Sequence, residues 1–214
     1  MLLPPPISYG VSAREHHRHA AARATINLSR LRSTIPRQPI GLTHSLRLAR
    51  EQADILLDHA RRTSSGPIMA ISRMPKLRVD YVTGQRLHGA SFWDRQARQW
   101  VIQVNWDDHW TRQLFTVAHE FKYILDYQHT DLLYQGSRTM TATSEAELAA
   151  NYFARYLLVP DDQLIEAVDS GATDPDDLAE KFGVTEDLIS DRLDDLHIMI
   201  NPVVRNLLTH RSTV

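Results

Sequence analysis

The residues best suited to chemistry are a histidine and a glutamate that stand side by side at positions 119 and 120. In the pattern His-Glu-x-x-His, two imidazoles one helical turn apart bind one zinc ion, and the glutamate beside them acts as general base. His119 and Glu120 match this pattern, but Tyr123 occupies the position of the second histidine. The sequence therefore predicts a metal-binding helix in which a phenol replaces one expected ligand.

A carboxylate on a second predicted helix is the next candidate. Glu147 is followed on the same helical face by Ala150, Asn151 and Ala154, and such small residues let another helix approach closely. Glu147 can face a metal held by the first helix. Alternatively, Ser144 and Glu147 form a capping box, in which Glu147 is the third helical residue and only closes the helix start. Both interpretations are open at this point.

A third histidine offers a replacement for the missing ligand. His129 lies ten residues after His119, the spacing of the third histidine in metzincins. Those enzymes bend the chain with a glycine, and Asp126 stands at that place here. The alternative is that His129 is an exposed loop histidine. Because the chain has no cysteine, any metal must bind histidine, carboxylate or phenolate groups.

Periodicity predicts the elements that position these residues. Apolar residues at helical spacing indicate helices, and alternating residues indicate strands. The expected elements are a helix over 43–62 capped by Thr43, strands at 78–82, 90–93 and 100–105 with the last two paired, helices over 110–127 and 144–158, and short helices over 161–196.

Composition and charge bound the classes of protein. The chain is 43% hydrophobic and 23% charged, as expected for a globular protein, and no run approaches the roughly 18 apolar residues of a membrane span. The start resembles no signal peptide, so we expect a cytoplasmic protein without a membrane partner. Residues 1–40 carry six arginines against one glutamate, whereas residues 141–214 hold fifteen acidic and five basic side chains.

The basic start is interpreted as a disordered arm, or else as an arm that touches nucleic acid or an acidic partner. The segment 178–193 has the outline of a helix-turn-helix with Gly183 at the turn, but its second helix offers Glu186, Asp187 and Asp191, and Arg192 is almost its only cation. Because phosphate contacts dominate affinity for nucleic acid, we expect no more than weak contacts from the arm.

These motifs together resemble the ImmA/IrrE family of metallopeptidases. The resemblance rests on Phe115-Thr-Val-Ala-His-Glu-Phe and on Glu147-Leu-Ala-Ala-Asn-Tyr-Phe-Ala-Arg-Tyr-Leu-Leu-Val-Pro160, and it covers residues 43–196. It implies an α+β, zincin-like fold with a small antiparallel sheet and helices that carry the metal motif. It also implies that His119 and Glu147 bind Zn²⁺, that Glu120 is the general base, and that Tyr123 stands where the family has a second histidine ligand.

The resemblance also suggests a domain organisation. A basic arm over 1–42 would precede a zincin-like peptidase domain over 43–160, and a helical segment over 161–214, similar to a helix-turn-helix, would pack on that domain.

The implied function is that of an intracellular zinc endopeptidase acting on a regulatory protein such as a helix-turn-helix repressor. Tyr123 is expected to weaken the zinc site, because a phenol with a pKa of about 10 must lose its proton before it can bind metal at neutral pH. The alternative is a pseudo-peptidase that keeps the fold and the groove and works by binding a regulatory protein. A DNA-binding protein is a third hypothesis, and it would depend on the basic arm.

Overall fold

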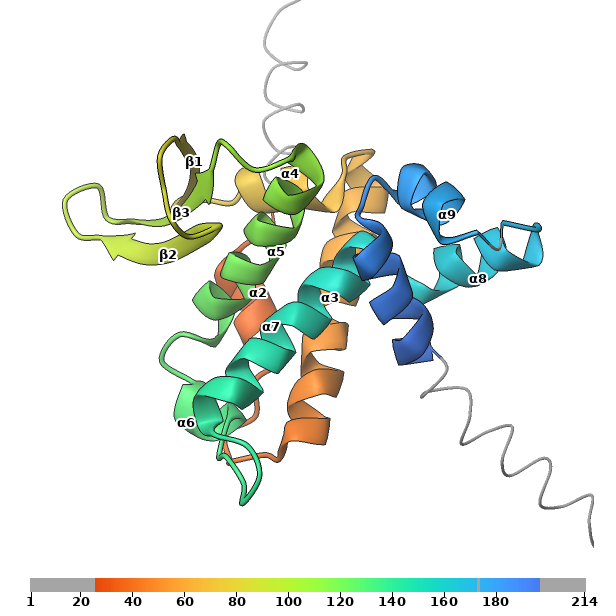
Figure 1. Cartoon of the computed structure of the whole chain (residues 1–214). Coiled ribbons are helices and arrows are strands. Elements are labelled where there is room, and N and C mark those ends of the chain that lie inside the picture. The colour runs from red at the N-terminus through yellow and green to blue at the C-terminus, as the bar shows by residue number, and fades with distance from the viewer. Residues whose placement is uncertain (1–25, 173, 197–214) are drawn as a thin grey trace, which may run out of the picture.

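The computed structural model describes residues 26–172 and 174–196 (Figure 1). Its elements in chain order are α2 (Leu28–Arg32), α3 (Leu42–Thr63), α4 (Pro67–Ser72), β1 (Leu77–Val82), β2 (Gly89–Asp94), β3 (Gln99–Asn105), α5 (Trp110–Asp126), α6 (Thr130–Leu133), α7 (Ala142–Leu158), α8 (Asp161–Asp169) and α9 (Pro175–Phe182). A last helical segment covers 186–196. No helix among the described residues is long and apolar enough to cross a membrane.

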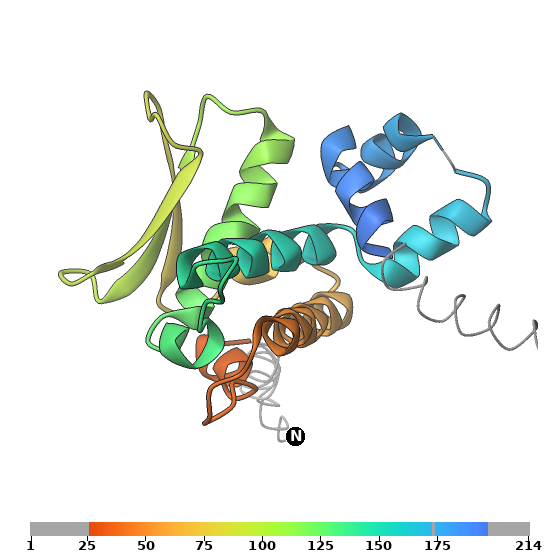
Figure 2. The ribbon, with the colours of Figure 1, turned by 60° about the horizontal axis from the view of Figure 1, so that its bottom comes forward.

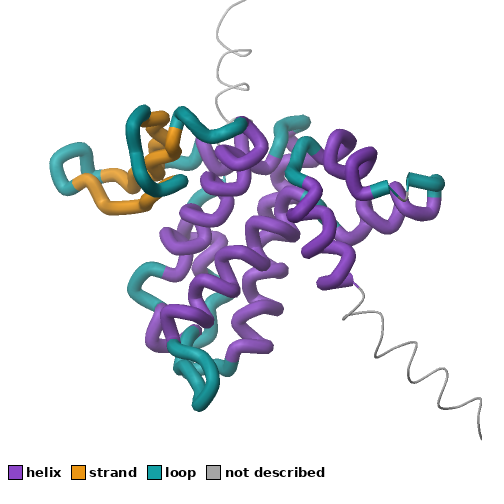
Figure 3. The backbone as a smooth tube through the Cα atoms, in the orientation of Figure 1, coloured by secondary structure: helices purple, strands orange, loops and turns teal. Residues whose placement is uncertain are grey.

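The fold is α+β, as predicted, with one small sheet among the helices (Figure 3). The strand order is β1-β3-β2, and the central strand β3 has fully buried Val101, Ile102 and Val104. β2 pairs antiparallel with β3, as expected for the predicted pair, but β1 pairs parallel with β3. The small sheet is therefore mixed rather than antiparallel throughout. β3 lies between β1 and β2 in the sheet. It runs opposite to β2 and in the same direction as β1.

The helix α5 lies between the sheet and the C-terminal helices (Figure 2). Its buried face includes Phe121 and Leu125 and belongs to the main hydrophobic core. The facing helix α7 contributes the fully buried Ala150 and Ala154, and its Phe153 ring lies 6.2 Å from the ring of Phe121. Small side chains on α7 thus let the two helices approach closely.

Residues before the predicted boundary at residue 42 also pack into the fold. Ile26 and Leu31 are buried in the main core. Arg32 donates from its guanidinium to the backbone oxygens of Ile124 and Leu125, the former 2.5 Å away, and so satisfies carbonyls at the C-terminal end of α5. Residues 26–42 therefore belong to the domain, and only residues 1–25 of the predicted arm lie outside the described residues. α3 begins after Gly41 without a side-chain cap, so the predicted cap at Thr43 was wrong.

The C-terminal helices have a small core of their own. Leu164, Leu178 and Ile189 are fully buried in it, and Phe115 of α5 packs partly against this core and partly against the main one. Arg192, expected to be an available cation, is 2% exposed; it donates to the Val159 backbone oxygen and forms an ion pair with Asp161. The only basic residue of the predicted recognition helix is therefore buried within the fold and does not offer its charge to phosphates.

A buried ion pair sits at the end of α5 beneath Tyr123. The Lys122 ammonium pairs with the Asp126 carboxylate four residues later, and the Tyr134 hydroxyl donates to the other oxygen of that carboxylate. Both side chains of the pair are almost fully buried. Burial lowers the pKa of Lys122, and the charge of Asp126 partly offsets this effect.

Replacing Lys122 by methionine should lower the free energy of unfolding more than removing the hydrogen bond that Tyr134 donates to Asp126. The Lys122→Met variant leaves the Asp126 charge buried without its cation, and breaking such a pair costs about 3–5 kcal/mol. The matched variant Tyr134→Phe removes one hydrogen bond to a charged group, which costs about 1.5–3 kcal/mol. Urea unfolding followed by circular dichroism gives both values, and a smaller cost for Lys122→Met than for Tyr134→Phe would contradict this assignment.

Candidate functional site

The predicted site residues from two helices meet at one cavity. α5 presents His119, Glu120 and Tyr123, and α7 presents Glu147. All four line a cavity of about 340 Å³. His119 and Tyr123 share a helical face because they are four residues apart, and Glu147 reaches them because α7 packs closely against α5.

Glu147 is the point where the side chains converge. One of its oxygens lies 3.6 Å from Nε2 of His119, and the other accepts a short hydrogen bond from the phenol of Tyr123. The rings of His119 and Tyr123 are arranged edge to face, with centroids 5.3 Å apart. Tyr123 and His119 therefore both point at the carboxylate of Glu147. Glu147 is itself one of the residues predicted to bind a metal.

The capping alternative for Glu147 is wrong. α7 begins at Ala142, and Thr141 is its N-cap, whose hydroxyl accepts a hydrogen bond from the backbone N–H of Ser144. Glu147 therefore lies in the second turn of the helix, beyond reach of the capping position. With its side chain 53% exposed and turned to His119 and Tyr123, Glu147 belongs to the cavity rather than to the helix end.

The phenol of Tyr123 is held in its protonated form. Its burial raises the pKa of this group above the ordinary value, and the hydrogen bond to Glu147 and the charge of that carboxylate raise it further. A protonated phenol can donate to Glu147, but it offers little to a cation. The hydrogen bond and a metal ion would compete for the same groups.

His119 is oriented by rings rather than by a hydrogen-bond acceptor. Its side chain is 14% exposed, and the ring of Phe115 lies 5.8 Å away on the preceding turn of α5. The Nδ1 atom of His119 is buried and has no hydrogen-bond partner. Histidines that bind metals almost always donate their other ring N–H to a carboxylate, a carbonyl or water; among the described residues, no protein group accepts from this atom.

These donors do not fit a complete catalytic zinc site. Two ligands of a tetrahedral zinc stand about 3.3 Å apart, given bonds of about 2.0–2.1 Å, so the pair His119 and Glu147 at 3.6 Å has suitable spacing. Catalytic zinc, however, takes three protein ligands, and the third position holds the protonated Tyr123. Within 26–172 and 174–196, no group of three histidine, cysteine or acidic side chains is arranged to hold a metal ion.

His129 does not complete the set. It lies beyond the end of α5, at the N-cap of the short helix α6, where its backbone N–H donates to the Asp126 carbonyl. His129 is not among the residues that line the cavity.

Three further features of the cavity were not predicted from the sequence. His88 lines its mouth and contacts Asp108 through Nδ1 at 2.7 Å, a pairing across twenty residues that no local motif signals. Arg112 lies 5.9 Å from the ring centre of Phe115 and also borders the cavity. Gly89 opens β2 so close to α5 that an added Cβ would stand 2.3 Å from Thr116 and 3.4 Å from the side chain of Glu120. A glycine is thus required where the strand passes the site.

Comparison with known proteins places this arrangement in context. A solved structure of a Mycobacterium tuberculosis transcriptional regulator is similar to the chain with a TM-score of 0.51 and 16% sequence identity, over 78% of this chain and 51% of that one. The chain thus spans about half the length of that regulator, and at this identity the likeness concerns the fold alone. No curated protein sequence matches the chain.

The family comparison agrees with the two motif helices and the sheet. The family described as the IrrE N-terminal-like domain matches residues 76–194, which is more than half of the chain and extends from β1 to the last helical segment. This region contains both helices of the site. The chain therefore belongs to the IrrE N-terminal-like domain family.

Proposed function

We propose that this chain is a regulatory protein with a metallopeptidase fold, which binds a segment of a protein partner in the cavity beside His119 and Glu147. The observation that carries the proposal is the hydrogen bond from Tyr123 to Glu147. It closes the third ligand position with a protonated group and ties up one of the two remaining ligands. The cavity of about 340 Å³ stays accessible for binding.

The partner is proposed to be a protein involved in transcriptional control, such as a helix-turn-helix repressor. The family and the regulator of similar fold support a regulatory role. His119, Glu120 and Tyr123 would contribute polar contacts in the cavity, while Phe115 supplies an apolar wall. Binding sites of this kind combine a few placed polar groups with apolar surface.

A second candidate function is slow proteolysis with weakly bound zinc. Glu120 stands beside His119 in the cavity, and the spacing of His119 and Glu147 suits two zinc ligands. If zinc displaces the phenol proton of Tyr123, the metal would supply a polarised water and Glu120 could accept its proton. The two candidates differ in affinity for zinc.

Restoring the histidine should tighten zinc binding. In Tyr123→His, an imidazole replaces the phenol and Glu147 loses its hydrogen-bond donor, so the affinity for zinc should rise by at least about 10-fold over the natural chain. Tyr123→Phe is the matched control, because it frees Glu147 without adding a ligand and should leave binding weak. Elemental analysis and competition with a chelator measure both.

Equal and tight zinc binding by the natural chain and Tyr123→His would show that another group already completes the metal site. The variant His129→Ala would then test the histidine predicted from the metzincin spacing. Because His129 does not line the cavity, we expect His129→Ala to leave zinc binding unchanged.

The restored site should also reveal the role of Glu120. Tyr123→His, loaded with zinc, should cleave a helix-turn-helix repressor that the natural chain binds, and should do so faster than the natural chain, because three ligands leave one position for water. Adding Glu120→Gln should abolish cleavage while zinc stays bound, since the general base is gone. Gel assays of the repressor follow both. Undiminished cleavage by the double variant would refute the general-base assignment.

Binding to DNA through the C-terminal helices is not supported by their chemistry. Glu186, Asp187 and Asp191 are exposed on the segment 186–196, whereas Arg192 is buried. Such a surface repels phosphates.

Any association with DNA should therefore be weak, independent of sequence and lost near physiological salt. Deleting residues 1–25, which include Arg14, Arg18 and Arg23 against Glu15 as the only acidic residue, should remove it, because this segment carries net positive charge. Mobility-shift titrations at low and near-physiological salt compare the two proteins. Sequence-selective binding that survives the deletion would instead support the DNA-binding hypothesis.

A further inference from the structure

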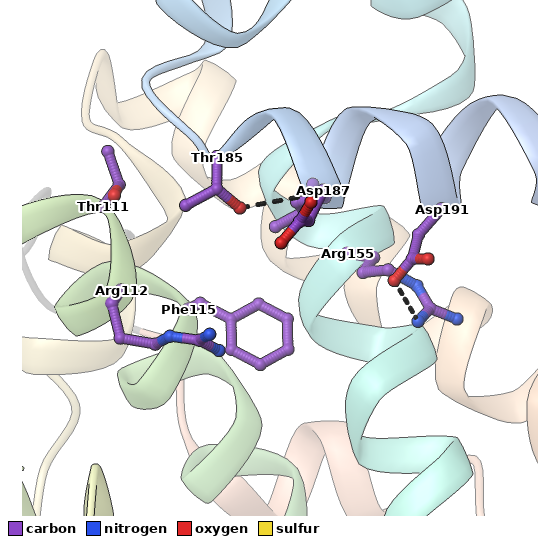
Figure 4. Close-up of a pocket in the computed structure, with 8 residues that line it drawn as sticks. Thr111, Arg112, Phe115, Arg155, Thr185, Asp187 and Asp191 are labelled. Atoms are coloured by element: carbon purple, nitrogen blue, oxygen red, sulfur yellow. Dashed lines mark hydrogen bonds and ion pairs between the residues drawn. The ribbon is translucent and has the colours of Figure 1, made fainter.

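Three adjoining cavities follow the N-terminal half of α5. The site cavity shares Arg112 and Phe115 with a second cavity of about 150 Å³, which is also lined by Asp187 and Asp191 (Figure 4). In that view the side chains of Arg112 and Phe115 face the segment 186–196, while Arg155 of α7 pairs with Asp191 at 3.1 Å. The second cavity in turn shares its border residues Thr111 and Thr185 with a third. Together the cavities make a track away from His119.

The third cavity has about 510 Å³ and one exposed aromatic wall. Trp110, the first residue of α5, is 53% exposed. Its indole lies against Gly183, which has a φ of +65° and leaves so little room that a Cβ there would stand 2.9 Å from the ring. The left-handed glycine thus ends α9 and seats the tryptophan. An exposed, positioned indole is a binding surface for flat or cationic groups.

Carboxylates surround this indole. Asp176 and Glu180 lie on one face of α9, Glu186 begins the last helical segment, and all three line the cavity and are exposed. Within the described part of the chain, none of the three forms an ion pair. By contrast, Asp191 of the second cavity is matched by Arg155. No lysine or arginine lines the third cavity, so its charge is open to a cation from outside.

We propose that the cavity between Trp110, α9 and the segment 186–196 binds an arginine side chain of the protein partner; this rests on the proposed function. A guanidinium can stack on the indole and donate to more than one carboxylate, whereas an ammonium is more strongly hydrated and has no flat face. The same carboxylates exclude a nucleic acid as the occupant. The occupant is thus a basic peptide segment.

The track also sets where the arginine stands in the partner. Trp110 and His119 are nine residues apart on one helix, which corresponds to an axial rise of about 14 Å at 1.5 Å per residue. Nine residues are about two and a half turns, so the two side chains project from opposite sides of the helix and the distance between them exceeds this rise. At about 3.3 Å per residue of extended peptide, a partner segment placed over His119 and Phe115 would therefore present its arginine more than about four residues away.

The test follows the indole signals of the full chain in nuclear magnetic resonance spectra. The protein has four tryptophans, and Trp110→Phe assigns the signal of Trp110. The probe is Nα-acetyl-L-arginine methylamide, and the neutral control is Nα-acetyl-L-citrulline methylamide, which has nearly the same shape. We expect a saturable shift of the Trp110 signal with the arginine probe, little shift with citrulline, and weakening with added salt. Equal shifts with both probes would overturn the proposal.

Two variants with neutralised carboxylates distinguish binding in the cavity from a general effect of net charge. The variant Asp176→Asn, Glu180→Gln, Glu186→Gln should lower the affinity for the arginine probe by about fivefold or more. The control variant Glu166→Gln, Asp169→Asn, Asp177→Asn changes net charge equally at exposed positions outside the cavity, and it should leave the affinity almost unchanged. Equal losses in both variants would mean that the probe responds only to net charge, which contradicts a specific site.

The basic arm of the same chain is the competing occupant. Replacing Arg14, Arg18 and Arg23 by glutamine in the full chain should leave binding of the probe unchanged if the occupant is a partner. Binding that begins only after this replacement would assign the cavity to the arm and overturn the proposal. The zinc and cleavage assays of Tyr123→His report on His119 and Glu147 in another cavity, so a failure of the arginine site can be distinguished from a failure of the proposed function.

Discussion

The close packing of α5 against α7 is the constraint on which the site depends. Fully buried Ala150 and Ala154 let α7 approach the face of α5 that carries Phe121, and this approach brings Glu147 to His119 on the adjoining face. A larger side chain at either alanine would separate the helices, because a packed interior tolerates extra volume poorly. On α5 the core residue Phe121 and the site residue His119 occupy different faces. The fold can therefore persist when the residue at position 123 changes.

The same proximity explains what Tyr123 does. A histidine at this position would complete a set of three donors, whereas the phenol reaches Glu147 and donates a hydrogen bond to it. Burial and this bond keep the proton on Tyr123, because both raise its pKa. The buried Nδ1 of His119 has no acceptor to orient it. Under the proposed function, each of these features weakens zinc binding, while the cavity and its connection along α5 remain. A binding function that retains the peptidase fold is consistent with all of them.

Sequence periodicity was sufficient for the parts of the fold that repeat locally. The predicted helices 110–127 and 144–158 and the strand 100–105 match α5, α7 and β3 within a few residues. Contacts between distant segments carry no such signal. The parallel pairing of β1 with β3, the burial of Leu31 and the pair His88–Asp108 depend on which segments meet, so they were missed or misjudged. Glu147 shows both cases. Its helix was predicted from periodicity, but only the observed start of α7 at Ala142 shows that Glu147 lines the cavity and is not part of the helix cap.

The central claim is that a hydrogen bond, rather than a metal ion, joins Tyr123 to Glu147 in the natural chain. Crystals of the natural protein grown with equimolar zinc, measured above and below the zinc absorption edge, test it directly. The account predicts the phenol of Tyr123 within hydrogen-bond distance of Glu147 and no fully occupied anomalous peak between His119 and Glu147. A full peak bonded to His119, Glu147 and the Tyr123 oxygen would contradict it and establish a phenolate zinc site.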